Sequence, residues 1–199
     1  NIFNDGAGTP KPVSITSGWF NNNTDMGLYV TSVGAISLTN VFAESNQDHG
    51  AYLDNNGVNT PQLVKVSGGN FSNNQGSRGL YIDSKGAVTV SNAQAHDNPN
   101  GNGVEIYNNG GSAVGNVSVT CSIGTCAFNN NFAYGLAIYS KGSITLGQLD
   151  AQNNGSGAIL DNNDGPSSSP KTVSISNCNF SNSNSTYGLS VISHGAISL

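Results

Sequence analysis

Short runs in which apolar and polar residues alternate recur along the whole chain. Four segments share one order: an alternating run, then a Phe, then a Gly that opens a second alternating run. These segments begin at Val13, Val64, Val117 and Val173. Two-residue alternation bounded by Asn, Gly and Ser is typical of short β-strands joined by turns, and helical periodicity is absent from the pattern. The sequence therefore predicts an all-β chain built from a repeat of about 52 residues.

Each repeat divides again into one short and one long coil, because residues Ile36 to Gly50 have the same pattern and spacing as residues Val13 to Gly27. Alternating runs begin at residues 13, 36, 64, 88, 117, 144, 173 and 197, so coil lengths alternate near 23–24 and 28–29 residues. The coil from residue 117 is 27 residues long, about four more than its class, and the excess falls at residues 121–126. We expect an inserted loop there.

Coils this short hold about three short strands each, and equivalent strands of successive coils would pair in parallel. Inward-facing apolar residues at equivalent positions of successive coils then stack on one another and form columns. The predicted core columns are Val13/Ile36/Val64/Val88/Val117/Ile144/Val173, Ile15/Leu38/Val66/Val90/Val119/Leu146/Ile175 and Leu28/Ala51/Leu80/Val104/Leu136/Ala158/Leu189. At one corner large and small residues alternate, as uniform packing density requires; they are Phe20/Ala43/Phe71/Ala95/Phe128/Ala151/Phe180.

The repeat V-x-I-x-x-(G/V)-x-(F/A)-x-x-N…G-(L/A)-x-(V/I/L) resembles right-handed parallel β-helix proteins, the pectate-lyase-like solenoids and the large secreted or cell-surface bacterial repeat proteins. This resemblance implies one right-handed parallel β-helix segment of about seven coils over residues 1–199, roughly 34 Å long. Neither terminus carries an atypical capping coil, so we expect a slice of a longer array. The architecture hosts enzymes, adhesins and stalks alike and does not fix an activity.

Two corner positions repeat in every coil. An asparagine ladder is predicted at one of them, where a side-chain amide bonds the coils above and below or caps its own bend; its members are Asn23, Asn46, Asn74, Asn98, Asn131 and Asn154. The glycines that precede each Leu-x-Val strand are expected to supply either a positive φ or a close approach of backbone; they are Gly27, Gly79, Gly135 and Gly188.

The composition of the chain argues against some classes of binding partner. Charged residues make up 9% of the chain, the net charge is −5 and Arg78 is the single arginine, which argues against a nucleic-acid groove. No apolar run reaches the length of a membrane span. Cys121 and Cys126 bracket the insertion, and we expect them to pair on a protruding loop, with Cys178 buried and unpaired. A disulfide fits an extracellular or cell-surface location.

Five tyrosines carry the candidate carbohydrate-binding face. Tyr29, Tyr52 and Tyr81 occupy one outward column on consecutive coils, and Tyr107 and Tyr139 stand one position along on the next two. Such a strip could stack sugar rings, although tyrosine also simply favours strands. Columns of Ser and Thr on the strands that open each coil resemble ice-binding ladders, which a lysine interrupts.

Acidic residues suggest two further chemistries. Asp54, Asp83 and Asp161 recur at outward positions just after the Gly-x-x-x strand. β-Helix enzymes that cut acidic polysaccharides use clusters of aspartates for calcium binding or acid catalysis. The motifs of polygalacturonases are absent. Asp54, Asp161 and Asp164 lie in Asp-Asn-rich turns that offer oxygen ligands to calcium, but such turns also form without a metal.

The sequence favours a structural, non-catalytic β-solenoid segment of an extracellular or surface protein, serving as a stalk, filament subunit or adhesin shaft. Its expected partners are further repeats or neighbouring copies stacked end to end, because a solenoid cut without caps exposes unpaired strand edges and an apolar cross-section. The alternative is a carbohydrate-binding or carbohydrate-active β-helix with a polysaccharide partner. Neither nucleic-acid binding nor membrane insertion is expected, and calcium is the one cofactor that the turns could accept.

Overall fold

A computed structural model describes residues 1–6, 9–57, 60–122, 124, 126–166 and 168–199. Within these residues the chain forms sixteen short strands and no helix, so the described part holds no helix that could cross a membrane. The strands are β1 (Ile2–Asn4), β2 (Val13–Thr16), β3 (Leu28–Ser32), β4 (Ile36–Phe42), β5 (Ala51–Asp54), β6 (Val64–Asn70), β7 (Arg78–Asp83), β8 (Val88–Ser91), β9 (Asn102–Asn108), β10 (Val117–Thr120), β11 (Tyr134–Ser140), β12 (Ile144–Gly147), β13 (Ser156–Asp161), β14 (Val173–Ser176), β15 (Leu189–Ile192) and β16 (Ile197–Ser198).

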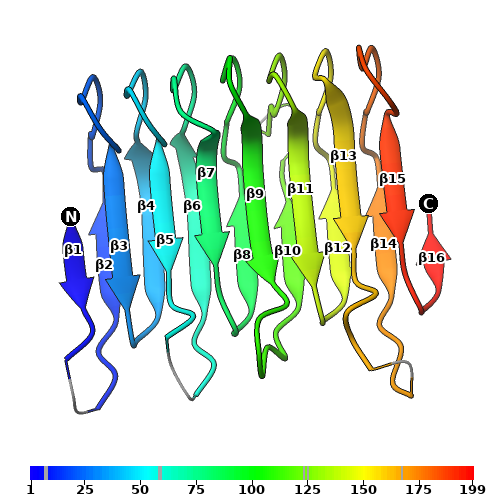
Figure 1. Cartoon of the computed structure of the whole chain (residues 1–199), viewed down its shortest axis with the longest axis horizontal. Coiled ribbons are helices and arrows are strands. Elements are labelled where there is room, and N and C mark those ends of the chain that lie inside the picture. The colour runs from blue at the N-terminus through cyan, green and yellow to red at the C-terminus, as the bar shows by residue number, and fades with distance from the viewer. Residues whose placement is uncertain (7–8, 58–59, 123, 125, 167) are drawn as a thin grey trace.

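The strands form two eight-stranded parallel sheets. One contains the odd-numbered strands in order from β1 to β15 and the other contains the even-numbered strands from β2 to β16. The odd sheet lies in front in Figure 1 and its strands run downward, while the even strands behind run upward as the chain steps from left to right. This winding is right-handed. The predicted right-handed parallel β-solenoid of about seven turns is therefore confirmed, with the two termini at opposite ends of the rod.

The register stacks the predicted core columns. Val13 pairs with Ile36 at one end of the even sheet and Val173 pairs with Ile197 at the other. The insertion leaves this register unbroken, since Val117 pairs directly with Ile144. Each internal coil buries its inward-facing apolar residues almost completely, so a slender rod gains a continuous core from a few side chains per coil.

The third face of each coil differs from the prediction of three strands. It consists mostly of single β-bridges, such as that between Trp19 and Phe42. Only between β4 and β6 does regular pairing reach this face, where Val41 pairs with Gly69 and Phe42 with Asn70. Residues in the left-handed region flank this face; in one coil they are Asn92 (φ 51°) and Asp97 (φ 56°). Because each such residue turns the chain sharply, the extended segment between them is too short for a regular strand.

The asparagine ladder is present. The side-chain Nδ2 of Asn46 donates to Oδ1 of Asn74 (2.9 Å), and that of Asn98 donates to Oδ1 of Asn131 (2.8 Å). Each buried Oδ1 also accepts the backbone N–H of the preceding rung, as Asn98 Oδ1 does from Asn74 (3.0 Å). Every rung therefore ties a side chain and a main chain of one coil to the next.

The glycines beside the ladder serve close approach and not a positive φ, which corrects one of the two expectations. A Cβ on Gly27 would lie 2.5 Å from Nδ2 of Asn46, and one on Gly135 would lie 2.5 Å from Nδ2 of Asn154. The positive φ angles belong instead to the residues just before each ladder position, such as Asn22 (φ 58°). Asparagine tolerates this conformation better than other side chains do, so the chain reserves glycine for the crowded site.

The opposite end of each coil carries a second buried polar column that the sequence analysis missed. In short turns a serine caps the backbone, as Ser140 Oγ accepts the N–H of Gly142 (2.9 Å). In long turns an asparagine reaches across the loop, as Nδ2 of Asn55 donates to the carbonyl of Gln62 (2.9 Å). The sequence feature that could have predicted this column is the Ser-x-Gly motif, which recurs in the short coils. The column is Ser32/Asn55/Ser84/Asn108/Ser140/Asn162/Ser193.

Candidate functional site

The five candidate tyrosines lie on the outer face of the odd sheet. Tyr29, Tyr52 and Tyr81 stand directly opposite one another on β3, β5 and β7. Tyr107 on β9 pairs with Tyr139 on β11, one outward position further along. The step between the two groups falls where Tyr81 faces a glutamate instead of a tyrosine.

The tyrosine rings form one continuous strip. The centroids of Tyr52 and Tyr81 are 4.5 Å apart, and those of Tyr107 and Tyr139 are 4.9 Å apart with the planes inclined by 17°. The two groups meet between Tyr81 and Tyr107 at 5.8 Å. These separations are close to the spacing of parallel strands, so each ring packs against the next along the rod axis. The rings thus use much of their faces on one another and stabilise successive coils.

A charged cluster interrupts the strip. Arg78 Nε forms an ion pair with Glu105 Oε2, which also accepts a hydrogen bond from Asn102 Nδ2 (2.9 Å). Glu105 is only 5% exposed although it lies on the outer face. The guanidinium of Arg78 covers it and lies 4.7 Å from the centre of the Tyr81 ring. The carboxylate therefore holds Arg78 against the tyrosines.

His49 extends this cluster by one coil. Its ring stacks on Tyr52 at 6.1 Å, its Nδ1 lies 2.9 Å from Asp48 Oδ1 and its Nε2 lies 3.5 Å from Nη1 of Arg78. Burial lowers the pKa of His49, and the nearby Arg78 acts in the same direction. Burial, followed by the charge of Glu105, raises the pKa of Tyr107 to about 12. The sequence analysis noted Arg78 only as the single arginine, and it predicted neither the buried Glu105 nor the stacked His49 as a site residue.

The calcium candidates are not brought together. Asp54 Oδ1 accepts the N–H of Asn56 (2.7 Å) and Asp161 Oδ1 accepts that of Asn163 (2.9 Å), so each turn is closed by its own side chain. Asp164 Oδ2 accepts from the side chain of Asn109 (2.7 Å).

In the outward column that holds Asp54, three residues separate it from Asp161: Asp83, Tyr107 and Tyr139. This separation corresponds to roughly 19 Å along the rod. The described residues hold no group of three or more His, Cys, Asp or Glu side chains arranged for a metal. Calcium binding stays a prediction.

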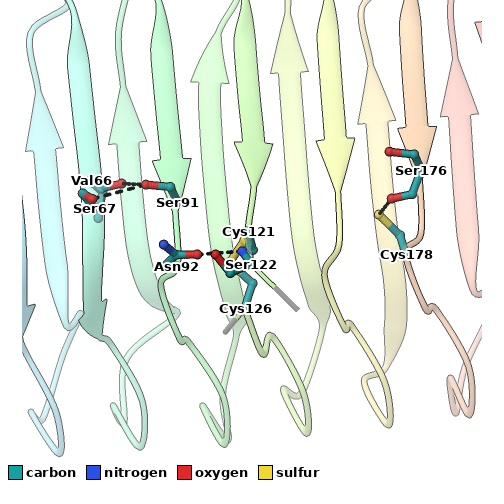
Figure 2. The surroundings of a disulfide bond; sticks show 9 residues. All are labelled: Val66, Ser67, Ser91, Asn92, Cys121, Ser122, Cys126, Ser176 and Cys178. Carbon is teal, nitrogen blue, oxygen red and sulfur yellow. Dashed lines mark hydrogen bonds between the residues drawn. A yellow bond between two sulfur atoms is a disulfide. The ribbon is translucent and has the colours of Figure 1, made fainter. Parts of the chain in front are cut away.

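Cys121 and Cys126 form a disulfide with their Cα atoms 5.8 Å apart (Figure 2). Cys126 is only 1% exposed and packs in the core, so the expectation that both cysteines protrude is wrong for it. Ser122 is exposed, and its N–H donates to Oδ1 of Asn92 in the preceding coil (2.8 Å); residues 123 and 125 of the insertion lie outside the described part.

Cys178 is unpaired, as expected, but it is half-buried and not buried. It lies in the same core column as Cys126 and Leu149, one coil beyond Leu149. Its Sγ lies 3.2 Å from the carbonyl oxygen of Ser176 (Figure 2). Burial raises the pKa of its thiol.

The odd sheet thus presents a flat strip of stacked tyrosines with an ion pair set into it, while the aspartates are distributed along the rod. Acid, cation and aromatic side chains meet around Glu105, where they bind one another. Comparison with protein-family models, with curated proteins and with solved structures finds no match to this chain.

Proposed function

We propose that this chain is a structural shaft segment of an extracellular or surface protein, a rigid spacer without catalysis. The observation that carries the proposal is the continuity of its cross-section. Core columns, the asparagine ladder and the tyrosine strip all run along the axis, and each coil uses its neighbours to cover its apolar interior.

The ends of the rod have the same cross-section as its internal junctions. Ile197, whose column is fully buried in the inner coils, is 47% exposed at one end, and Leu199 is 83% exposed. At the other end Val13 and Ile15 are only partly buried. A further coil of the same pattern would cover these residues and pair the edge strands. We therefore infer that each end face stacks on such a coil, from the same polypeptide or from another copy.

The extracellular location rests on the disulfide. Cys121 and Cys126 form a small closed loop, and such bonds persist in oxidising compartments. Low charge and abundant Asn, Ser and Gly suit an exposed polar rod of this kind.

Carbohydrate binding by the tyrosine strip is the second candidate. It is supported by the continuity of the rings from Tyr29 to Tyr139, which present phenol edges and hydroxyls along one line. It is the weaker candidate because the ring faces that would stack on a sugar lie against neighbouring tyrosines.

Sedimentation velocity of the 199-residue chain over a wide concentration range tests the shaft. We expect head-to-tail oligomers that grow with concentration. Leu199→Lys, which sets a charge on an end face, should reduce the association. Val114→Lys is the matched control, because Val114 is 73% exposed and lies away from the ends, on the loop between β9 and β10. A strictly monomeric rod at high concentration, or equal effects of the two variants, contradicts the proposal.

A further inference from the structure

The turns between the asparagine ladder and the next glycine differ in length from coil to coil. Two residues, Gly155 and Ser156, lie between Asn154 and Gly157. The corresponding turn of the preceding coil has three residues (132–134), and that of the following coil has four (184–187). A short turn of small residues between two longer turns leaves a recess across the side of the rod.

This recess has a volume of about 680 Å³. Its floor is fixed, because Ser156 N–H donates to the carbonyl of Ala133 (2.8 Å) and the Ser185 hydroxyl donates to the carbonyl of Gly155 (2.6 Å). A Cβ on Gly155 would lie 2.2 Å from the carbonyl oxygen of Phe132, so a larger residue cannot take its place. Beside the recess, the hydroxyls of Tyr134 and Tyr187 lie 3.4 Å apart and tie the two flanking coils together.

The lining combines one exposed aromatic ring with uncharged polar groups. Phe132 is 71% exposed on one wall. The side chains of Asn130, Asn153, Asn184 and Thr186 also line the recess, and they make no hydrogen bond to any described residue. No lining residue carries a charge. Their donors and acceptors are therefore open to a ligand.

A pyranose ring matches this chemistry: its C–H face packs on an aromatic ring and its hydroxyls bond amides and hydroxyls. An anionic sugar would meet no lysine or arginine in the recess. We propose that the recess over Gly155 and Ser156 is a binding subsite for a neutral saccharide residue, stacked on Phe132. One wall of the site (residues 184–186) belongs to the last coil of the rod, between β14 and β15. The site does not include the tyrosine strip, and it does not rest on the shaft proposal.

The test is a titration of the isotope-labelled chain with cellotetraose, xylotetraose, laminaritetraose and chitotetraose, followed by two-dimensional NMR. We expect at least one of these neutral sugars to shift the amide signals of residues 132–134, 155–156 and 184–186. Phe132→Ala should weaken that binding about tenfold and Phe132→Tyr should retain it. Trp19→Ala is the matched control, because Trp19 is 77% exposed on the third face of the first coil and its loss should leave the affinity unchanged.

Trigalacturonate serves as the anionic probe and should bind more weakly than the neutral sugars. The proposal is overturned if none of the four tetrasaccharides shifts these signals, if trigalacturonate binds more tightly, or if Phe132→Ala binds as the parent chain does. Phe132→Ala should also leave the concentration-dependent sedimentation intact, so failure of this site and failure of the shaft proposal give different results.

Discussion

Replacing Asn74 with Ala removes one rung from the middle of the asparagine ladder. Asn74 is 0% exposed, and its Oδ1 accepts both the backbone N–H (3.0 Å) and the side-chain Nδ2 (2.9 Å) of Asn46. Its own Nδ2 donates to the carbonyls of Ala43 (3.0 Å) and Ser72 (3.2 Å). The substitution therefore leaves two buried donors and two buried carbonyls without these partners.

A buried group left unsatisfied costs about 1–3 kcal/mol, and carbonyls suffer less than N–H groups because they have two lone pairs. We expect Asn74→Ala to lower the free energy of unfolding by about 4 kcal/mol. Asn23→Ala is the matched control: Asn23 is exposed, and its side chain only donates, to Asn46 Oδ1 (2.8 Å). Its loss should cost about 1 kcal/mol.

Urea unfolding followed by far-UV circular dichroism measures both variants, with the midpoints compared at a common slope. The reasoning fails if the two substitutions agree within about 1 kcal/mol, because the position within the ladder would then not determine the loss.

Three further predictions concern a glycine beside the ladder, the ionisation of Tyr107 and the disulfide. Gly103→Ala should destabilise the chain by about 3 kcal/mol, since its Cβ would lie 2.5 Å from the nearest carbonyl oxygen, whereas Gly57→Ala, with nothing within 4 Å, should have little effect; equal unfolding midpoints in guanidinium would contradict this. In the folded chain Tyr107 should ionise near its raised pKa of about 12, above the ordinary value of about 10. The stabilisation linked to Tyr107 is then fully present below about pH 10 and is lost as the pH rises towards about 12. Identical absorbance titrations at alkaline pH for folded and unfolded chains would refute the assignment. Cys121→Ser should cost about 2 kcal/mol through the opened loop, and Cys126→Ser should cost more because it buries a hydroxyl; thermal melts with a reversed order would show that Cys126 is not a core residue.

Much of the fold could be predicted from the sequence because the solenoid repeats one unit. Core columns such as Val64 on Ile36 follow from alternation alone, and the ladder follows from the constant spacing of its asparagines. Positive φ was harder to place, since Asn22 and Gly27 both suit a corner. Only the stacked coils show that Gly27 lies against Asn46, where a Cβ would not fit.

The candidate sites could be predicted only in part. The tyrosine columns follow from the register, but the partners of Arg78 do not, because Glu105 reaches it from the next strand of the sheet. The recess beside Phe132 depends on turn lengths in three successive coils and on the small size of Gly155 and Ser156. Aligning the coils on their shared residues hides these differences in turn length, although they determine the shape of the surface.

The alternation of large and small side chains at the Phe corner limits how such a rod can grow. Phe71 and Phe128 are each fully buried between alanines. Inserting or deleting a single coil would place Phe on Phe or Ala on Ala, which means overpacking or a cavity. A gene that lengthens this rod by duplication must therefore copy coils in pairs, about 52 residues and roughly 9.6 Å at a time.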